Sequence, residues 1–295
     1  MVVEGVEQPL RSIGRTLDDL LDWAASALGS PVSRSDSSWG HDRSVVLQLR
    51  NREGARWFLK HPRDAGRFRR ELNAYETVLP TFGDLVPPLV AASLPLRCLL
   101  LGGLPGELAR GSDRAADPEV HRQAGAFLAR LHGSSPPEPA PGTNERFVEQ
   151  RDSVLRRAEG VIDAAQFEYL RRATTALVEI VEPVTVMCHL DFWQRNWLVD
   201  EHGTLRVIDF GQANRDLAIR DFGLLAHRGP VRPHLQDAFF DGYGRRLDDD
   251  EQAQIDGLAV LTGVKRVLRA QSQSPLALAR ARRLLAQSTA RASPQ

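Results

Sequence analysis

The residues of this chain whose types could do chemistry together lie in two short motifs. The stretch CHLDFWQRNWLVD places His189, Asp191 and Asn196 in the pattern H-x-D-x-x-x-x-N, and Asp209 follows in VIDFG. Two carboxylates and an amide oxygen are hard oxygen donors. They suit Mg²⁺, which completes its shell with phosphates and water, and they suit Zn²⁺ poorly because zinc prefers His and Cys. The pattern therefore indicates a magnesium-phosphate site.

Two short apolar strands are expected to position these side chains. The segments VTVMCHL and LRVIDF flank a DEHG turn, which predicts a hairpin. Because a hairpin brings its strand ends together, we predict that Asp191, Asn196 and Asp209 converge on one small volume. Alone, an Asp-Phe-Gly triplet is usually a turn after a strand and a His-x-Asp pair is usually structural, so the interpretation depends on their combination.

A cation for nucleotide phosphates is expected in the first part of the chain. Lys60 and Lys265 are the only lysines among 38 basic residues. Lys60 ends the second strand of a predicted hairpin, with strands near 44–49 and 56–60 around a turn at Gly54. A lysine ammonium is a compact point charge suited to phosphate. A solvated strand end is the alternative for this lysine.

A carboxylate to orient Lys60 is expected on the next helix. Glu71 lies on the buried stripe of that helix, which is formed by Phe68, Leu72, Tyr75 and Leu79. A charge on a buried stripe is costly unless it is paired. We therefore predict a pair between Glu71 and Lys60; pairing of Glu71 with a nearby arginine is the alternative.

With these motifs together, the chain resembles the aminoglycoside phosphotransferase family, small-molecule kinases with the protein-kinase fold. The kinase pattern of strand Lys, helix Glu, catalytic-loop Asp and Asn, and metal-binding Asp-Phe-Gly is matched by WFLK, RRELNAYE, CHLDFWQRNWLVD and VIDFG. LLLGGLPGELA is similar to the family's hinge, and AGAFLARLHGS to its central helix. The resemblance covers roughly residues 35–226.

The resemblance implies a role for each motif residue. Asp191 would accept a hydrogen bond from the acceptor hydroxyl, and Asn196 and Asp209 would hold Mg²⁺. The nucleoside triphosphate, ATP or GTP, would be bound by Lys60, oriented by Glu71, with its base against the hinge near Leu101 and Gly103. His189 would support the metal-binding loop. Asp221, in the second Asp-Phe-Gly, would brace the catalytic loop through backbone hydrogen bonds.

The chain departs from the family pattern in three places. Leu190 stands where Gly or Arg is usual, and the loop SRSDSSWGHDRS over the phosphates has a single glycine, Gly40. Arg195 precedes Asn196; a contact to a phosphate or acidic substrate and a structural ion pair are both open for it.

The implied fold is α+β and bilobal, protein-kinase-like, with a small β-rich N-lobe and a larger, mostly helical C-lobe. The expected boundaries are a nucleotide-binding lobe over 1–102 and a catalytic and acceptor-binding lobe over 103–295, with a helical insert at about 134–182. Helices are predicted over 16–30 and from about 233 onward, and a strong amphipathic helix carries Val120, Ala124, Phe127, Leu128 and Leu131 on one face.

The acceptor is expected to be a small hydroxylated molecule, and an antibiotic is the favoured class. Aminoglycosides are polycations and call for carboxylates, for which Asp237, Asp241 and the run 248–251 are candidates. Against this, seven basic and no acidic residues follow from Gly257 onward. A neutral or anionic antibiotic, such as a nucleoside, peptide or macrolide, or a metabolite, is equally compatible.

Three other functions are compatible with parts of the pattern. A catalytically silent nucleotide-binding scaffold is disfavoured by the complete set of motif residues. A protein kinase is disfavoured because no activation segment fits between Asp209 and Asp221 and no Ala-Pro-Glu follows. A metal-dependent hydrolase built on His189 and Asp191 would need further histidine ligands in a pattern that is absent from the sequence.

Composition limits the partners. Basic and acidic residues balance at 38 each, so no global field favours nucleic acid or an anionic membrane. No apolar run approaches the roughly 20 residues of a membrane span, and we expect no signal peptide at the start of the chain. Cys98 and Cys188 have no metal-ligand spacing and are expected to be reduced. The expected location is the cytoplasm, and the oligomeric state is left open.

Overall fold

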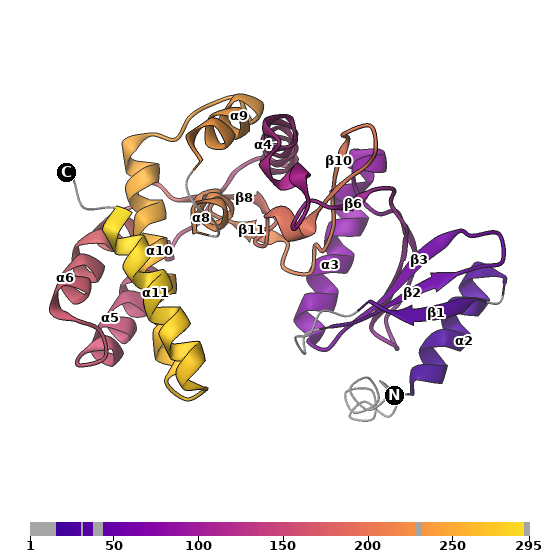
Figure 1. The fold of residues 1–295 in the computed structure, drawn as a ribbon, viewed down its shortest axis with the longest axis horizontal. Coiled ribbons are helices and arrows are strands. Elements are labelled where there is room, and N and C mark those ends of the chain that lie inside the picture. The colour runs from indigo at the N-terminus through magenta and orange to yellow at the C-terminus, as the bar shows by residue number, and fades with distance from the viewer. Residues whose placement is uncertain (1–15, 31, 38–43, 228–231, 292–295) are drawn as a thin grey trace. The chain divides into compact units, whose positions relative to one another are not determined.

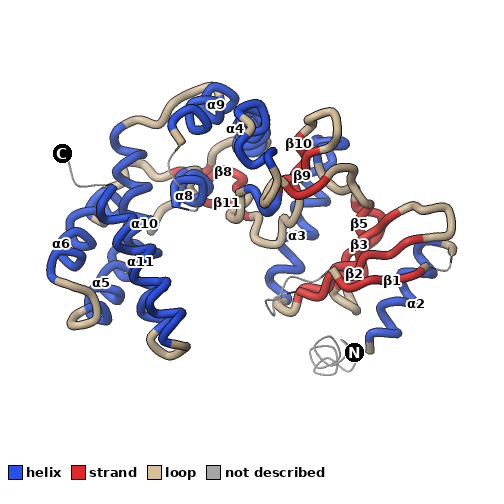
Figure 2. Tube along the Cα trace, in the orientation of Figure 1, coloured by secondary structure: helices blue, strands red, loops and turns tan. Residues whose placement is uncertain are grey.

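The computed structural model describes residues 16–30, 32–37, 44–227 and 232–291. Contacts divide the chain into two compact units; Figure 1 colours the chain by residue number and Figure 2 colours it by secondary structure. The first unit comprises Met1–Val120 and Trp193–Asn214, and the second comprises His121–Phe192 and Arg215–Gln295. The segment Trp193–Asn214 thus folds with the first unit, although its sequence neighbours on both sides belong to the second. The lobe boundary near residue 102 stays a prediction.

The first unit is built on a five-stranded antiparallel sheet in the order β1-β2-β3-β5-β4. Strands β2 and β3 pair from Ser44↔Pro62 to Arg50↔Arg56 around a turn in which Gly54 has a φ of 87°. This is the hairpin that the sequence predicts. Its strands are β1 (Ser33–Asp36), β2 (Ser44–Arg50), β3 (Arg56–Pro62), β4 (Leu89–Ser93) and β5 (Cys98–Gly102).

Helix α2 (Leu17–Leu28) packs on this sheet. Thr16 and Asp19 form a capping box at its start, and Gly29 ends it in the left-handed conformation, as the sequence predicts. The buried face of the helix joins alternate residues of the strands in one apolar cluster. Its members include Leu17, Leu20, Ala24, Val45, Leu47, Leu49, Leu59 and Leu100.

Helix α3 (Ala65–Thr77) follows β3 directly. The Asp64 side chain accepts from Arg67 N and caps the helix. The predicted stripe is buried, since Phe68, Leu72, Tyr75 and Leu79 are 8% exposed or less. The 3₁₀ segment η1 (Leu79–Leu85) continues from it to β4.

A second, three-stranded sheet completes the first unit in the order β10-β9-β6. Its strands are β6 (Glu107–Leu108), β9 (Trp197–Val199) and β10 (Leu205–Val207), and the short 3₁₀ segments nearby are η2 (Asp113–Ala116) and η3 (Gln194–Asn196). The DEHG turn therefore joins β10 to β9. The predicted pairing of VTVMCHL with LRVIDF is wrong, because the former segment pairs elsewhere.

That segment forms β8 (Val184–Cys188), the central strand of a sheet in the order β11-β8-β7. Its neighbours are β7 (Glu138–Pro139) and β11 (Asn214–Asp216). Arg215 holds this sheet to the preceding loop through the carbonyls of Thr185 and Pro136 and the hydroxyl of Ser135.

Helices make up most of the second unit. The amphipathic helix α4 (Pro118–His132) buries the predicted face, with Val120, Ala124, Phe127, Leu128 and Leu131 at 4% exposure or less. Long α10 packs against α5, α6, α7, α8 and α11. The remaining helices are α5 (Thr143–Ala158), α6 (Ala164–Ala173), α7 (Thr175–Val178), α8 (Ile219–His227), α9 (Pro233–Tyr243), α10 (Asp249–Ala270) and α11 (Pro275–Arg291).

Candidate active site

Lys60 joins two carboxylates inside the first unit. It lies on β3, opposite Val46 and Leu99, and its Nζ is 2.6 Å from Glu71 Oε1 and 2.7 Å from Asp209 Oδ1. Lys60 and Glu71 are buried, whereas the Asp209 side chain is 28% exposed. The structure thus contains the pair expected between Lys60 and Glu71 and adds Asp209 to it. We call Lys60, Glu71 and Asp209 the lysine triad.

The charge of Lys60 is fixed by its two partners. Burial alone would lower the pKa of Lys60, but the charges and hydrogen bonds of Asp209 and Glu71 outweigh burial and raise that pKa. Lys60 is therefore an ammonium with three donors. Two of them are used by the triad.

Asp209 and Asn196 come together through the small sheet. Asn196 ends η3 and is 2% exposed, and its carbonyl accepts from Ile208 N at 3.0 Å, next to Asp209. Asp209 has a φ of 65°, in the left-handed region that side chains rarely adopt. At Gly211 a β carbon would lie 3.2 Å from Glu71 Oε2, so glycine leaves the triad its space.

The donors of this unit fit the metal that the sequence indicates. Asp209 offers a carboxylate and Asn196 an amide oxygen, both of them hard donors that suit Mg²⁺. Glu71 Oε2 is buried and makes no hydrogen bond to any described residue. A metal-nucleotide would therefore meet oxygen ligands here, with no thiol or imidazole among them.

The catalytic-loop residues His189 and Asp191 lie in the second unit, after β8. Asp191 is 6% exposed, and its N–H donates to His189 Nδ1 at 3.3 Å. The Asp221 carboxylate, fully buried on α8, accepts from His189 N at 2.8 Å and from Leu190 N at 2.6 Å. These are the backbone hydrogen bonds that the family resemblance implies for Asp221. The second Asp-Phe-Gly is thus part of a helix.

Leu190, which departs from the family pattern, has an unusual backbone conformation. Its φ of 60° lies in the left-handed region, where glycine is favoured and a leucine side chain is strained. The hydrogen bond from its N–H to Asp221 holds this conformation.

The predicted site residues therefore divide between the units. Lys60, Glu71, Asn196 and Asp209 belong to the first, and His189, Asp191 and Asp221 belong to the second. The structure brings together the members of each set. Convergence of the two sets on one nucleotide and one acceptor stays a prediction.

The hinge residues Leu101 and Gly103 continue the sheet of the first unit. Leu101 lies on β5 opposite Phe58 and Leu89. Gly103 N donates to Arg56 O at 2.8 Å, and a β carbon at Gly103 would lie 2.8 Å from that oxygen, so this close approach needs glycine. Because the amide is used by the protein, a nucleotide base at Gly103 would have to contact its carbonyl oxygen. The phosphate loop with Gly40 lies outside the described residues.

Sequence reasoning considered Arg195 but missed Arg110, Trp193, His132 and Tyr243. Arg110 and Arg195 both stack on Trp193, with guanidinium carbons 5.2 and 5.0 Å from the ring centroid. His132 and Tyr243 reach Asp221 through hydrogen bonds. The burial of His132 could have been predicted, because it follows Ala124 and Leu128 at a spacing of four and so continues their buried stripe.

The carboxylates considered for a cationic acceptor are largely paired within the second unit. Arg246 binds Asp237 at 2.6 Å and Asp241 at 3.0 Å. Arg245 binds Glu251 at 2.6 Å, and Asp248 caps α10. Two arginines thus offset part of the negative charge of these carboxylates.

Within the described residues, no helix is long and apolar enough to cross a membrane.

The proteins that this chain resembles include several phosphotransferases. The model of the phosphotransferase enzyme family matches residues 37–258. Among solved structures, macrolide 2'-phosphotransferase MphH from Brachybacterium faecium has 18% identity and a TM-score of 0.65, with 95% of this chain and 98% of that chain covered. APH(2")-IIia in complex with GDP and kanamycin has 16% identity and a TM-score of 0.69, covering 88% and 94%. Macrolide 2'-phosphotransferase type I has 18% identity and a TM-score of 0.63, covering 91% and 96%. No curated protein sequence matches the chain.

The chain belongs to the phosphotransferase enzyme family, since the family model spans most of its length. Its fold is the α+β, protein-kinase-like fold of these phosphotransferases. It is an enzyme of the class that transfers phosphate to an alcohol group of a small molecule.

Proposed function

We propose that this enzyme transfers the γ-phosphate of ATP or GTP to a hydroxyl of a small antibiotic, in resistance or self-resistance. The observation that carries the proposal is the lysine triad next to Asn196, a cation and hard oxygen donors within one unit. GDP and kanamycin in one neighbour, and macrolides in the names of two others, support a nucleotide donor and an antibiotic acceptor.

Each residue then has a defined task. The third donor of Lys60 binds a phosphate oxygen while Glu71 and Asp209 keep the ammonium in place. Asn196 and Asp209 would hold Mg²⁺, which when bound neutralises charge on the phosphates. Asp191 accepts a hydrogen bond from the acceptor hydroxyl and aims it at the phosphorus. A weak base is sufficient, because phosphoryl transfer has a loose transition state and depends on positioning and charge stabilisation.

The charges of the second unit favour an acceptor that is not a polycation. Asp237 and Asp241 share a single cation, Arg246, and Glu251 is paired with Arg245. From Gly257 onward the chain has only basic charges. Macrolide, nucleoside or peptide antibiotics therefore fit this charge distribution better than aminoglycosides do.

The test is nucleotide turnover against a panel of acceptors. ADP or GDP release is measured with Mg²⁺ across macrolides, aminoglycosides, nucleoside and peptide antibiotics and small metabolic alcohols. Asp191→Ala should abolish release while nucleotide binding is kept. Asp152→Ala is the matched control, because Asp152 is a partly exposed residue paired with its neighbour Arg151.

The outcomes separate the alternatives. An antibiotic hit that is lost in Asp191→Ala supports the proposal, and a hit among metabolic alcohols alone indicates a metabolite kinase. Tight nucleotide binding without turnover of any acceptor indicates a silent scaffold. An active Asp191→Ala protein would contradict the role of Asp191.

A further inference from the structure

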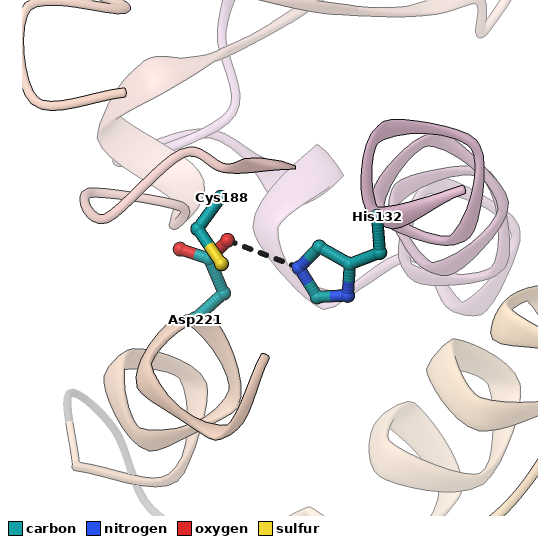
Figure 3. Close-up of side chains that lie close together, drawn as sticks. All are labelled: His132, Cys188 and Asp221. Atoms are coloured by element: carbon teal, nitrogen blue, oxygen red, sulfur yellow. Dashed lines mark hydrogen bonds and ion pairs between the residues drawn. The ribbon is translucent and has the colours of Figure 1, made fainter. Parts of the chain in front are cut away.

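Three titratable side chains meet in the interior of the second unit, as Figure 3 shows. His132 ends α4, Cys188 ends β8 and Asp221 lies on α8, and one ligand atom of each lies within 4.8 Å of the others. All three are buried. Such a group could hold a metal ion, so the hydrogen bonds of each member decide what it does.

Those hydrogen bonds argue against a metal. Both oxygens of Asp221 accept backbone N–H groups, and both ring nitrogens of His132 have partners. Burial, followed by the charges of Asp221 and Asp216, raises the pKa of Cys188, so it stays a thiol, whereas metals bind the thiolate. The Cys188 thiol instead donates to Asp216 O.

The same contacts form a continuous chain of hydrogen bonds from α9 to the catalytic loop. The Tyr243 hydroxyl lies 2.9 Å from His132 Nδ1, and His132 Nε2 lies 3.2 Å from Asp221 Oδ2. Asp221 in turn binds the backbone N–H groups of His189 and Leu190. This series of hydrogen bonds ends at Leu190, the residue before Asp191. We call it the tyrosine relay.

The direction of the hydrogen bonds follows from the chemistry of the groups. An ionised carboxylate only accepts, so His132 Nε2 must carry a proton to bind Asp221. In a neutral ring Nδ1 is then an acceptor, and the Tyr243 hydroxyl donates to it. Asp221 therefore fixes the tautomer of His132, and the Tyr243 hydroxyl, by donating to Nδ1, holds the ring in its orientation.

The backbone holds Tyr243 at a fixed distance from His132. Helices α4 and α9 cross at two glycines: a β carbon at Gly125 would lie 1.9 Å from Phe239 O, and one at Gly242 would lie 1.8 Å from Arg122 O. The two backbones therefore touch directly beside Tyr243. A methyl group at either position would push the helices apart.

An aromatic ring completes the packing around the relay. Phe222, next to Asp221, meets Tyr243 edge-on at 5.0 Å and His132 at 5.7 Å between ring centroids. The side chains of the relay are thus fixed by close packing as well as by hydrogen bonds.

We propose that Tyr243 is a positioning residue for phosphoryl transfer. Acting through His132 and Asp221, it holds the backbone that carries Asp191, which includes the strained left-handed Leu190. The inference rests on the proposed role of Asp191. Through these contacts α9, which lies far from the catalytic motifs in sequence, influences the geometry of the catalytic loop.

The kinetic test is Tyr243→Phe, which removes one hydroxyl and keeps the ring. We expect kcat to fall about tenfold, which is about 1.4 kcal/mol, while the KM for nucleotide stays within twofold. Tyr169→Phe is the matched control, because Tyr169 lies on α6 and its hydroxyl makes no hydrogen bond within the described residues. An unchanged kcat in Tyr243→Phe would overturn the proposal.

A double-mutant cycle separates the relay from general packing. His132→Leu removes the acceptor of the Tyr243 hydroxyl, so Tyr243→Phe should have no further effect on kcat in that background. An equal fall of kcat in both backgrounds would show that Tyr243 acts independently of His132, against the proposal.

A measurement without turnover keeps this inference distinct from the proposed function. Nitrogen-15 NMR of histidine-labelled protein reports the tautomer of His132, with His132→Gln used to assign its signal. We expect the Nε2–H tautomer in the wild type, and in Tyr243→Phe the same tautomer with a shifted Nδ1 signal, because Nδ1 loses its hydrogen bond. An Nδ1–H tautomer of His132 in the wild type would overturn the relay. If His132 has the expected tautomer but the protein is inactive on every acceptor, only the proposed function is contradicted.

Discussion

Replacing Asp221 by Asn tests how the catalytic loop is held. The Asp221 carboxylate is fully buried, and each of its oxygens accepts a backbone N–H, from His189 and from Leu190. An amide of the same shape has one acceptor oxygen, so its NH₂ group would face a donor. One backbone N–H then loses its partner.

The size of the effect follows from these contacts. A buried unsatisfied donor costs about 1–3 kcal/mol, and the remaining hydrogen bond loses its charge assistance, about 1 kcal/mol more. We therefore expect Asp221→Asn to lower the free energy of unfolding by about 2–4 kcal/mol. Since a displacement of about 1 Å at a reacting group costs roughly a hundredfold, kcat should fall by about that factor.

Urea unfolding and steady-state kinetics measure both effects. Asp152→Asn, the same exchange at a partly exposed ion pair, should change the free energy of unfolding by less than about 1 kcal/mol. If Asp221→Asn unfolds within about 0.5 kcal/mol of the wild type and keeps kcat within twofold, Asp221 does not hold the loop.

Three further perturbations test the buried groups. Glu71→Gln leaves Lys60 with Asp209 as its one charged partner in the triad, and should lower the free energy of unfolding by about 2–4 kcal/mol. It should also weaken nucleotide binding, as measured by calorimetry. An unchanged nucleotide affinity would contradict the role of the triad. The partners of Lys60 raise its pKa above 10.5, so its contribution to the free energy of unfolding is complete below pH 10.5 and is lost as the pH rises further. Above pH 10.5 the urea midpoint of the wild type should therefore fall more steeply than that of Lys60→Met. Burial raises the pKa of Cys98 to about 12 and also raises that of Cys188, so a disulfide reagent should find no fast thiol in the native protein and two after unfolding.

Local signals in the sequence were sufficient for most helices and for the first hairpin. The capping box of Thr16 and Asp19 and the glycine at position 29 define α2 because the side chains involved lie within one turn of the backbone they bind. Likewise, the buried stripes of α3 and α4 follow from helical spacing alone. The pair of Lys60 and Glu71 was also predictable, since an isolated charge on a buried stripe needs a partner.

Strand pairing and the tyrosine relay required the three-dimensional structure. The segment VTVMCHL is apolar and precedes a turn region, but β9, with only three residues, intervenes and takes the pairing with β10. Short apolar strands carry little information about their partner. The relay joins His132 to Tyr243 across 111 positions, and only the crossing of α4 and α9 brings these residues together.

The most direct test of the account is the fate of the transferred phosphate. With the antibiotic acceptor that gives turnover, mass spectrometry should show one phosphate added to one hydroxyl for each nucleotide consumed. Asp191→Asn should bind the nucleotide with unchanged affinity and form no phosphorylated acceptor. Nucleotide consumption without a phosphorylated acceptor in the wild type, or transfer at the wild-type rate by Asp191→Asn, would contradict the account.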